Sequence, residues 1–223
     1  MRLSAEGERF VNKPPERAPS DPGVRERLLA SAIDCFDRKG YAACSVREIV
    51  EAAGVTKPVL YYHYGSKEGI FNALMRQAMD QFDELLERAS HSEGSARDRI
   101  EKLFGEVFDL FKRSIPLVRV MNSIYYGPPQ GVPRGDADRV HFAFQEWVKK
   151  RLVEGRNAGE FKIAKTEDGM WALIGALNVA TELELCHPDL ALTQKDLQRV
   201  VGVVFDGIAS EEGRAPRRAA KRR

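Results

Sequence analysis

Long apolar stretches are missing from this sequence of 223 residues. No apolar run reaches the roughly 18 residues that a membrane-spanning helix needs, so we expect no membrane contact. The first 23 residues have no apolar central stretch, which argues against a secretory signal. Their prolines and charges instead favour a disordered leader over residues 1–20. With 43% apolar residues the chain can still bury a substantial core.

Cysteine and histidine are scarce, with three and four residues respectively. Cys35, Cys44 and Cys186 are odd in number and lack the spacing of metal ligands, so we expect reduced thiols in a cytoplasmic protein. Cys186 and His187 are adjacent, but no third ligand follows at a suitable spacing. The sequence therefore predicts no metal site.

Sequence signatures of catalysis are also missing. There is no glycine-rich phosphate loop, no nucleophile elbow and no cluster of metal ligands. Carboxylates are abundant, but on helix surfaces they need no catalytic role. We expect neither an enzyme nor a bound cofactor.

The charge is nearly balanced, yet it is unevenly distributed. The chain has 35 basic and 33 acidic residues, a net charge of +2. The last ten residues, RAPRRAAKRR, hold six of the basic residues and no acidic one. The body is therefore mildly acidic and the tail, residues 211–223, basic and flexible. The tail is either a solubilising end or an arm that adds non-specific affinity for phosphates.

Residues 44–67, CSVREIVEAAGVTKPVLYYHYGSK, carry the most informative pattern of the chain. Ser45 followed by Glu48 three residues later is a capping box that begins a short helix. Gly54 ends this helix, because the turn needs the positive φ that glycine adopts easily. Thr56 is positioned to cap a second helix. Helix, glycine turn and capped helix form a helix-turn-helix, whose second helix enters the DNA major groove.

The wider block of residues 25–74 resembles the N-terminal domain of the TetR family of transcriptional regulators. The positions that match the family are Phe36, Gly40, Tyr41, Ser45, Val46, Ile49, Ala53, Gly54, Val55, Leu60, Tyr61, His63, Ser66, Lys67 and Glu68. Two positions depart from it, with Val50 in place of the usual alanine and Tyr64 in place of phenylalanine. We expect the larger Val50 to alter the angle between the two helices.

This resemblance and the chemistry of the side chains together assign the DNA contacts. Lys57 can donate to guanine O6 and N7, whereas Pro58 and Val59 can make only apolar contacts, best with a thymine methyl. The N–H groups at Thr56 can face a phosphate or a base edge, and Arg47 can bind either. The other predicted DNA contacts are Ser45, Tyr61, Tyr62, His63 and Lys67, of which Lys67 is expected to clamp a phosphate. For the two tyrosines, ordinary aromatic packing is the alternative.

Apolar residues beyond the helix-turn-helix recur at helical spacing, and we expect an all-α protein of about nine helices. Later helices should follow N-caps at Ser66, Thr166 and Thr193, and the proline-rich and glycine-rich residues 127–135 should be irregular. The predicted domains are a helix-turn-helix DNA-binding domain at 21–67 and a helical effector-binding and dimerisation domain at 68–210.

The last expected helix is apolar on more than one face. Its apolar residues are Leu197, Val200, Val201, Val203, Val204, Phe205 and Ile208. A surface helix needs only one apolar stripe. Either the second stripe meets a partner subunit, as the resemblance implies for the last two helices, or the helix is fully buried within one subunit.

The second domain is also expected to bind a small apolar or amphipathic effector. Candidate ligand contacts are the aromatic and polar residues Phe104, Phe108, Met121, Tyr125, Phe144, Trp147, Trp171, Asn178 and Glu182. Asn178 and Glu182 are four residues apart and share one helix face. Ordinary core packing is the alternative for the aromatic residues, and solvent or a partner subunit for the polar pair.

The resemblance implies a dimeric, sequence-specific regulator of transcription that binds double-stranded operator DNA. We expect a repressor that the effector releases. The alternative is an architectural or division-related DNA-binding protein of the same fold, which would bind many sites and ignore small molecules.

Overall fold

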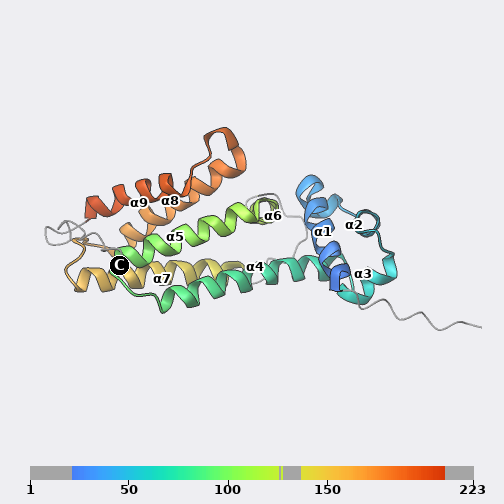
Figure 1. The fold of residues 1–223 in the computed structure, drawn as a ribbon, viewed down its shortest axis with the longest axis horizontal. Helices are drawn as coiled ribbons and strands as arrows, with labels where there is room; N and C mark the ends of the chain where they lie inside the picture. Colours follow the sequence, from blue (N-terminus) through green and yellow to red (C-terminus); the bar gives the residue numbers. More distant parts are fainter. Residues whose placement is uncertain (1–21, 126, 128–136, 209–223) are drawn as a thin grey trace, which may run out of the picture.

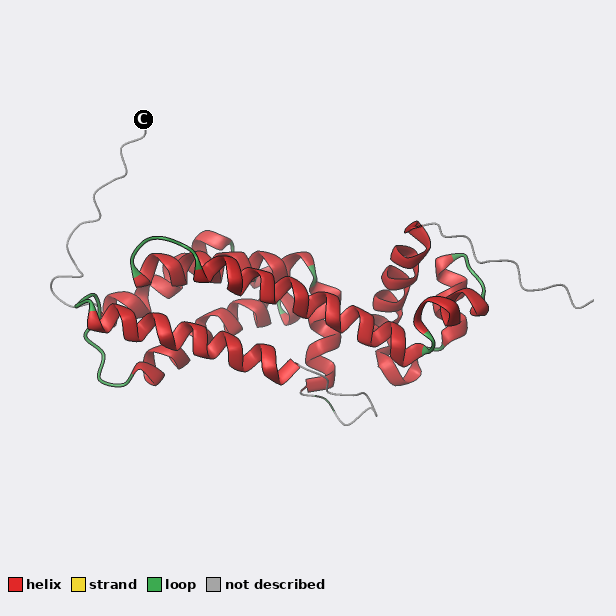
Figure 2. Cartoon of the chain, turned by 90° about the horizontal axis from the view of Figure 1, so that it is seen from below, coloured by secondary structure: helices red, strands yellow, loops and turns green. Residues whose placement is uncertain are grey.

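A computed structural model describes residues 22–125, 127 and 137–208 of the chain. The described residues form an elongated molecule with a small group of helices at one end and a larger bundle at the other (Figure 1). The α-helices are α1 Pro22–Ala43, α2 Val46–Ala53, α3 Lys57–Tyr64, α4 Lys67–Ser90, α5 Ala96–Arg113, α6 Ile115–Tyr125, α7 Ala137–Asn157, α8 Thr166–Cys186 and α9 Gln194–Ile208. No β-strand occurs among these residues (Figure 2), which confirms the all-α prediction.

The small group of helices encloses its own core, here called the first core. It consists of Val24, Leu28, Ala32, Cys35, Phe36, Tyr41, Cys44, Ile49, Val50, Ala53, Leu60, Ile70, Phe71, Leu74 and Val120. Most of these residues come from α1, α2 and α3, but three come from the start of α4 and one from α6. The first core therefore continues past residue 67, where we expected the DNA-binding domain to end.

A glycine bends the chain near the end of α1. Gly40 has a φ of 78°, a conformation that favours glycine, and it interrupts the helical backbone of α1. The bend brings Cys44 back to Cys35, with 5.8 Å between their Cα atoms, and the two sulfurs form a disulfide. The prediction of three reduced thiols is therefore wrong for this pair, and only Cys186 is free. The spacing of nine residues gave no sign of a pair, because it is the bend that brings the two cysteines together.

The larger bundle is built around α5. This helix packs against α4, α7, α8 and α9. The buried side chains of these five helices, from Phe82 of α4 onward, form the second core, whose largest fully buried members include Phe104, Phe108 and Phe205. The central helix of the bundle is thus α5 and not α9. Among the described residues, no helix is long and apolar enough to cross a membrane.

Two helices connect the small domain to the bundle. α4 contributes Ile70 and Leu74 to the first core and Phe82 and Leu85 to the second. α6 buries Val120 in the first core. The neighbouring Arg119 pairs with Asp37 of α1 at 2.8 Å. A change in the packing of α4 or α6 within the bundle can therefore reach α1 directly.

Several predicted helix ends agree with the structure and one does not. Ser66 accepts a hydrogen bond from the N–H of Gly69, and Thr193 accepts one from the N–H of Asp196, so both act as caps. Thr166 is not the N-cap of α8, because the helix already includes it and Lys165 precedes it without a capping bond. Residues 1–20, 211–223 and most of 127–135, for which we predicted a leader, a tail and a loop, lie outside the described residues.

Candidate nucleic-acid interface

The first helix of the helix-turn-helix is held by the predicted capping box. The Ser45 hydroxyl accepts a hydrogen bond from the N–H of Glu48 at 3.3 Å, and the Glu48 carboxylate accepts one from the N–H of Ser45 at 2.9 Å. Lys39 of α1 also pairs with this carboxylate. Hydrogen bonds from Lys39 and Ser45 lower the pKa of Glu48 to about 2. A permanently charged Glu48 therefore ties α2 to α1 at neutral pH.

The turn and the second helix follow as the sequence predicts. Gly54 adopts the left-handed conformation with φ 67° and ends α2. Thr56 has the extended backbone of an N-cap, although its side chain makes no capping bond. The Thr56 hydroxyl is thus available to an outside acceptor, whereas the N–H groups of Val59 and Leu60 already donate to the Thr56 carbonyl at 3.1 and 3.4 Å.

One face of α3 is exposed and the other holds the helix in place. Leu60 is fully buried in the first core, as predicted. Lys57 and Pro58 are exposed, and so are Tyr61 at 49% and Tyr62 at 72%. The exposed rings and hydroxyl groups of these two tyrosines suit contact with a sugar–phosphate backbone.

Two predicted DNA contacts of α3 lie deeper than expected. Val59 is partly buried and packs against the first core, so little of it can reach a thymine methyl. The Nε2 atom of His63 is buried without a hydrogen-bond partner among the described residues. The His63 ring centroid lies 5.1 Å from that of Tyr62, in an edge-on arrangement. Both residues therefore support the exposed face instead of forming it.

Arg47 is exposed, as a DNA contact requires, but it is not free. Its guanidinium pairs with Glu51 at 2.6 Å along α2. This pair raises the pKa of Arg47, so the guanidinium stays charged. An exposed pair of this kind is weak, and a phosphate or a guanine can replace Glu51 as the partner.

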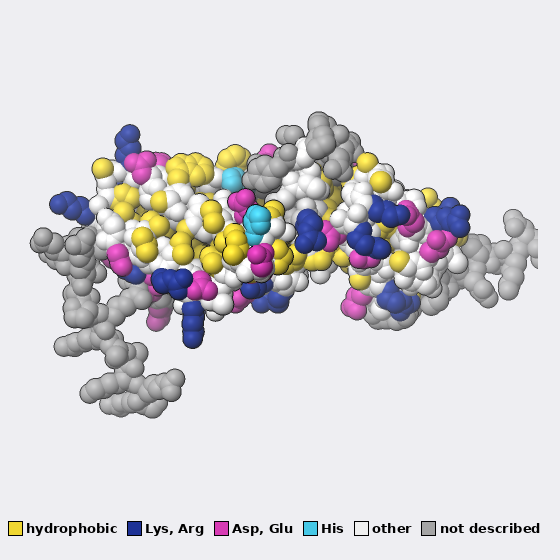
Figure 3. Space-filling model, turned by 90° about the horizontal axis from the view of Figure 1, so that it is seen from above, with side chains coloured by type: hydrophobic (Ala, Val, Ile, Leu, Met, Phe, Trp, Pro, Cys, Tyr) yellow, Lys and Arg dark blue, Asp and Glu magenta, His cyan; other side chains and the backbone are white. Residues whose placement is uncertain are grey.

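The exposed side chains of the small domain give it a mixed surface. Figure 3 shows several Lys and Arg side chains over the end of the molecule that carries the helix-turn-helix. The predicted contacts that are exposed on the small domain are Ser45, Arg47, Thr56, Lys57, Pro58, Tyr61 and Tyr62. They combine cations, hydroxyl groups and backbone N–H groups, which are the usual donors to phosphates and base edges.

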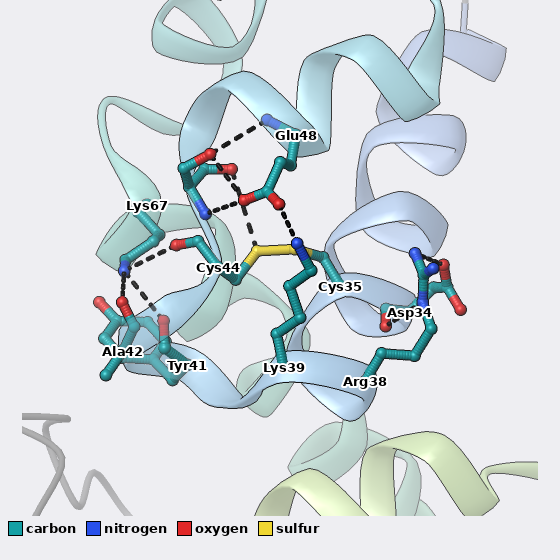
Figure 4. Close-up of a disulfide and its surroundings, with 10 residues drawn as sticks. Asp34, Cys35, Arg38, Lys39, Tyr41, Ala42, Cys44, Glu48 and Lys67 are labelled. Carbon is teal, nitrogen blue, oxygen red and sulfur yellow. Dashed lines mark hydrogen bonds and ion pairs between the residues drawn. A yellow bond between two sulfur atoms is a disulfide. The ribbon is translucent and has the colours of Figure 1, made fainter.

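The predicted phosphate clamp, Lys67, has a different environment. Its ammonium donates to the carbonyl oxygens of Tyr41 at 2.9 Å, Ala42 at 3.4 Å and Cys44 at 3.0 Å (Figure 4). It also lies 4.5 Å from the centroid of the Tyr41 ring. Lys67 therefore satisfies the orphaned carbonyls at the end of α1, a role that sequence reasoning missed.

A second exposed surface lies on α8 and α9 and is apolar. It includes Trp171 at 55%, Val179 at 53%, Val200 at 37% and Val203 at 70% exposure. Figure 3 shows apolar side chains gathered over the bundle on this side. Gly175 and Gly207 belong to the same two helices, and nothing lies within 4 Å of where their Cβ atoms would be. The alternative of a fully buried last helix does not hold within one chain.

The structure does not bring the predicted effector contacts into one site. Phe104, Phe108, Phe144 and Trp147 are buried together in the second core. Trp171, Asn178 and Glu182 are exposed on α8. Met121 and Tyr125 belong to α6, where Met121 is partly buried. The polar pair thus lies on the outer surface of α8 and not beside the aromatic cluster.

Two hollows between α4 and α5 were not expected from the sequence. The larger has a volume of about 380 Å³ and is lined by Gln81, Glu84, Leu85, Arg88, Leu110, Arg113 and Ser114. The smaller, of about 70 Å³, is lined by Arg88, Ala89, Ser92, Arg99, Lys102, Leu103 and Glu106. They share Arg88, and we call the two together the α4–α5 groove. Its lining holds four cationic side chains, two carboxylates and three leucines.

Metal ligands do not converge anywhere in the part of the chain that the structure describes. No group of three His, Cys, Asp or Glu side chains is placed to hold an ion. The two surfaces and the groove are therefore the sites to be explained.

Comparison with known proteins agrees with this geometry. Residues 28–74 match the family model described as "Bacterial regulatory proteins, tetR family". The HTH-type transcriptional activator FasR of Mycolicibacterium smegmatis is 30% identical over 120 residues, 53% of this chain and 54% of that protein. The biofilm operon regulator IcaR of Staphylococcus epidermidis, named as a negative transcriptional regulator, is 28% identical over 45% of this chain and 54% of that protein.

The likeness in fold extends beyond the matched sequence. The chain spans about half the length of the curated relatives it matches. The solved structure of the TetR family transcriptional regulator PfmR from Thermus thermophilus superposes with a TM-score of 0.67 at 22% identity, covering 81% of this chain and 97% of that one. The matched block contains the capping box, the glycine turn and the exposed face of α3. Residues 28–74 of this chain therefore belong to the family of bacterial regulatory proteins described as tetR, and the chain shares the overall fold of a regulator of that family.

Proposed function

We propose that this protein is a dimeric, sequence-specific DNA-binding regulator that acts as a repressor in the cytoplasm and is released by an amphipathic effector. The observation that carries the DNA-binding part is the exposed face of α3, with Lys57, Tyr61 and Tyr62 outside and Leu60 fully buried inside. Such a face on a short helix matches what a reading helix needs in a major groove. As a transcription regulator of this family, the chain is not an enzyme.

Dimerisation is supported by the apolar surface of α8 and α9. Trp171, Val179 and Val203 are each more than half exposed, which is costly for one subunit alone. Gly175 and Gly207 leave space on the same helices for the close approach of partner helices. Pairing two subunits there would form a four-helix bundle and place two reading heads on half-sites roughly 34–36 Å apart or a multiple of that distance.

Repression requires fewer functional surfaces of this molecule than activation does. A repressor needs only to occupy its operator, whereas an activator must also present a surface to the transcription machinery. The named functions of the relatives differ, since FasR is named an activator and IcaR a negative regulator. A reporter gene placed behind the selected operator distinguishes the two signs, because deletion of a repressor raises expression and deletion of an activator lowers it.

The effector part of the proposal rests on the α4–α5 groove. Its lining includes the cations Arg88, Arg99, Lys102 and Arg113 and the apolar side chains Leu85 and Leu110. Arg88 pairs with Glu106 at 3.6 Å and Arg99 with Glu154 at 3.0 Å, and an anionic ligand would compete with these carboxylates. An amphipathic anion fits this combination. α4 continues from the groove into the first core, so a ligand that prefers one position of α4 shifts the reading heads.

DNA selection with the full chain tests the proposal. We expect enrichment of a two-fold symmetric sequence, and binding that weakens as salt rises because phosphate contacts release counterions. A genome-wide binding map then separates a regulator from an architectural protein, which would occupy many dispersed sites. Recovery of random sequence only, or of no DNA, would overturn the assignment of α3 as a reading helix.

A further inference from the structure

The disulfide in the small domain has no part in the function proposed so far. It joins Cys35 near the end of α1 to Cys44, nine residues later, directly before the N-cap of α2. Both cysteines belong to the first core and are 4% and 1% exposed. Cys186, the third cysteine of the chain, is exposed and lies at the end of α8.

The disulfide holds the connection from α1 to α2 together with two weaker ties. Figure 4 shows Lys39 reaching the Glu48 carboxylate on one side of the sulfurs and Lys67 donating to three carbonyls of the connection on the other. The N–H of Cys44 also donates to the carbonyl of Gly40 at 3.2 Å. The disulfide is the one covalent tie among those shown there, and chemistry in a cell can make and break it.

The connection leads directly to predicted DNA contacts. Ser45 follows Cys44 and caps α2, and Arg47 is the second residue of that helix. α2 in turn packs against the reading helix α3. When the disulfide is broken, Cys44 can move more freely, and Ser45 and Arg47 move with it. Fixing this segment in one position on DNA then costs conformational entropy, and this cost reduces the affinity for DNA.

We propose that Cys35 and Cys44 form a reversible thiol–disulfide site that sets the affinity of the protein for DNA, with the oxidised form binding more tightly. This inference rests on the proposed function, because it presumes that the small domain binds DNA. The site takes thiols as reductants and peroxides as oxidants.

Reduction is an exchange with two thiols of a reductant. A thiolate of the reductant attacks one sulfur, the Cys35–Cys44 bond breaks, and the departing sulfur takes a proton. A second reductant thiol then attacks the mixed disulfide, which frees the other cysteine and leaves the reductant as a disulfide. In the oxidising direction, hydrogen peroxide converts one cysteine to a sulfenic acid and releases water. The other cysteine attacks that sulfur, which forms the disulfide and releases a second water.

Burial of the two sulfurs couples this exchange to DNA binding. A reductant reaches them only when the α1–α2 connection opens, because the sulfurs lie in the first core. DNA that holds Ser45 and Arg47 in place opposes this opening. By linkage, DNA that binds the oxidised form more tightly must also make the disulfide harder to reduce.

The test compares the full chain in its two redox states, with the Cys186→Ser variant as the background that prevents intermolecular disulfides. Thiol titration should count no free thiol after hydrogen peroxide and two after dithiothreitol. Fluorescence anisotropy with a duplex recovered by selection should show affinity lower by roughly tenfold after reduction, and restored after reoxidation. The same duplex should shift the dithiothreitol equilibrium of the protein toward the disulfide.

A variant that cannot form the bond completes the test. Cys35→Ala combined with Cys44→Ala should bind like the reduced protein whether or not dithiothreitol is present. If circular dichroism shows that this variant does not fold, the two states of the Cys186→Ser protein still decide. Equal affinity of the oxidised and reduced protein would overturn the inference and leave the proposed function standing. Two thiols that persist after peroxide would also overturn it. Absence of DNA binding in both states would overturn the proposed function itself.

Discussion

At the scale of single residues, Lys67 shows how a cation beside a reading helix can serve the fold instead of the DNA. Its ammonium donates to the carbonyls of Tyr41, Ala42 and Cys44. These carbonyls belong to the end of α1 and the connection beyond it, where no helical N–H groups remain to satisfy them. Removing the ammonium leaves partly buried acceptors unpaired.

We therefore predict that Lys67→Ala lowers the free energy of unfolding by roughly 2 kcal/mol, the range for hydrogen bonds to a charged group. Chemical denaturation of the variant measures this loss. The salt dependence of DNA binding by the folded fraction should stay the same. If the variant instead keeps its stability and the salt slope of its DNA binding falls by about one unit, Lys67 is a phosphate contact, as the sequence predicted.

Glu48 gives the small domain a dependence on pH with a definite sign. Lys39 and Ser45 lower the pKa of Glu48 to about 2 from its ordinary value of 4.5. Because the folded pKa is lowered, the charged carboxylate stabilises the fold above about pH 4.5, and this contribution is lost as the pH falls toward 2.

Replacement of Glu48 by Gln should therefore lower the melting temperature most at neutral pH. We expect the difference between wild type and Glu48→Gln to shrink steadily between pH 4.5 and 2. Glu51→Gln is the matched control, because Glu51 lies on the same helix in an exposed pair that contributes little. A difference that does not change with pH would show that shape, not charge, makes Glu48 useful.

At the scale of the helices, α3 separates residues that read DNA from residues that hold the helix. Lys57 is exposed and can donate to a base, whereas Val59 is partly buried against the first core. Lys57→Ala should change the preferred DNA sequence and reduce affinity for the original one by about 1–3 kcal/mol. Val59→Ala should leave the preferred sequence alone and reduce stability by about 1–2 kcal/mol.

Binding-site selection with each variant, and with Lys195→Ala of α9 as an exposed control, measures these effects. The same consensus from wild type and Lys57→Ala would place Lys57 on the phosphate backbone. A changed consensus from Val59→Ala would show that this side chain reaches the bases in the complex.

Local features of the helices could be predicted from the sequence, and contacts across the chain could not. The capping box at Ser45 and the turn at Gly54 depend on residues close together in the chain, so their pattern is visible in the sequence. The partners of Lys67 lie 23 to 26 residues earlier. The Cys35–Cys44 bond needs the bend at Gly40, whose direction the sequence does not specify.

The effector contacts failed to converge for a related reason. Periodicity shows that Phe104 and Trp171 each lie on an apolar helix face, but not that one face is in the core and the other outside. α8 is apolar on two sides, so its period alone does not tell which side meets α5. The sequence did not predict the α4–α5 groove, because arginines are common on helix surfaces and form no distinctive sequence pattern there.

At the scale of the whole molecule, the α4–α5 groove should favour anions with an apolar tail. We expect decanoate to raise the melting temperature of the protein and decylamine, its cationic counterpart, to have a smaller effect. Arg88→Ala combined with Arg113→Ala should abolish the response to decanoate, because these residues line the larger hollow. Lys150→Ala of α7 serves as an exposed control. Equal responses to both compounds would argue against a groove selective for charge.

Dimerisation is the other property of the whole molecule, and Val203 tests it most cleanly. Val203 is 70% exposed in one subunit, so a charged residue there should not disturb the fold of that subunit. Val204 is less suitable, because it packs against the second core and its replacement would also destabilise the monomer. At a subunit interface, by contrast, Val203→Glu would bury an unpaired charge on each side of the symmetry axis.

We therefore predict that Val203→Glu is monomeric by light scattering while its helical content stays that of the wild type. Its affinity for a two-half-site operator should fall by at least ~10²-fold, because the second head no longer binds as part of the same molecule. Affinity for an isolated half-site should not change. Gln77→Glu, at an exposed position of α4, controls for the added charge. If the Val203→Glu protein remains dimeric and binds the full operator normally, the subunit interface lies elsewhere. The exposed valines and Trp171 of α8 and α9 would then contact a different partner.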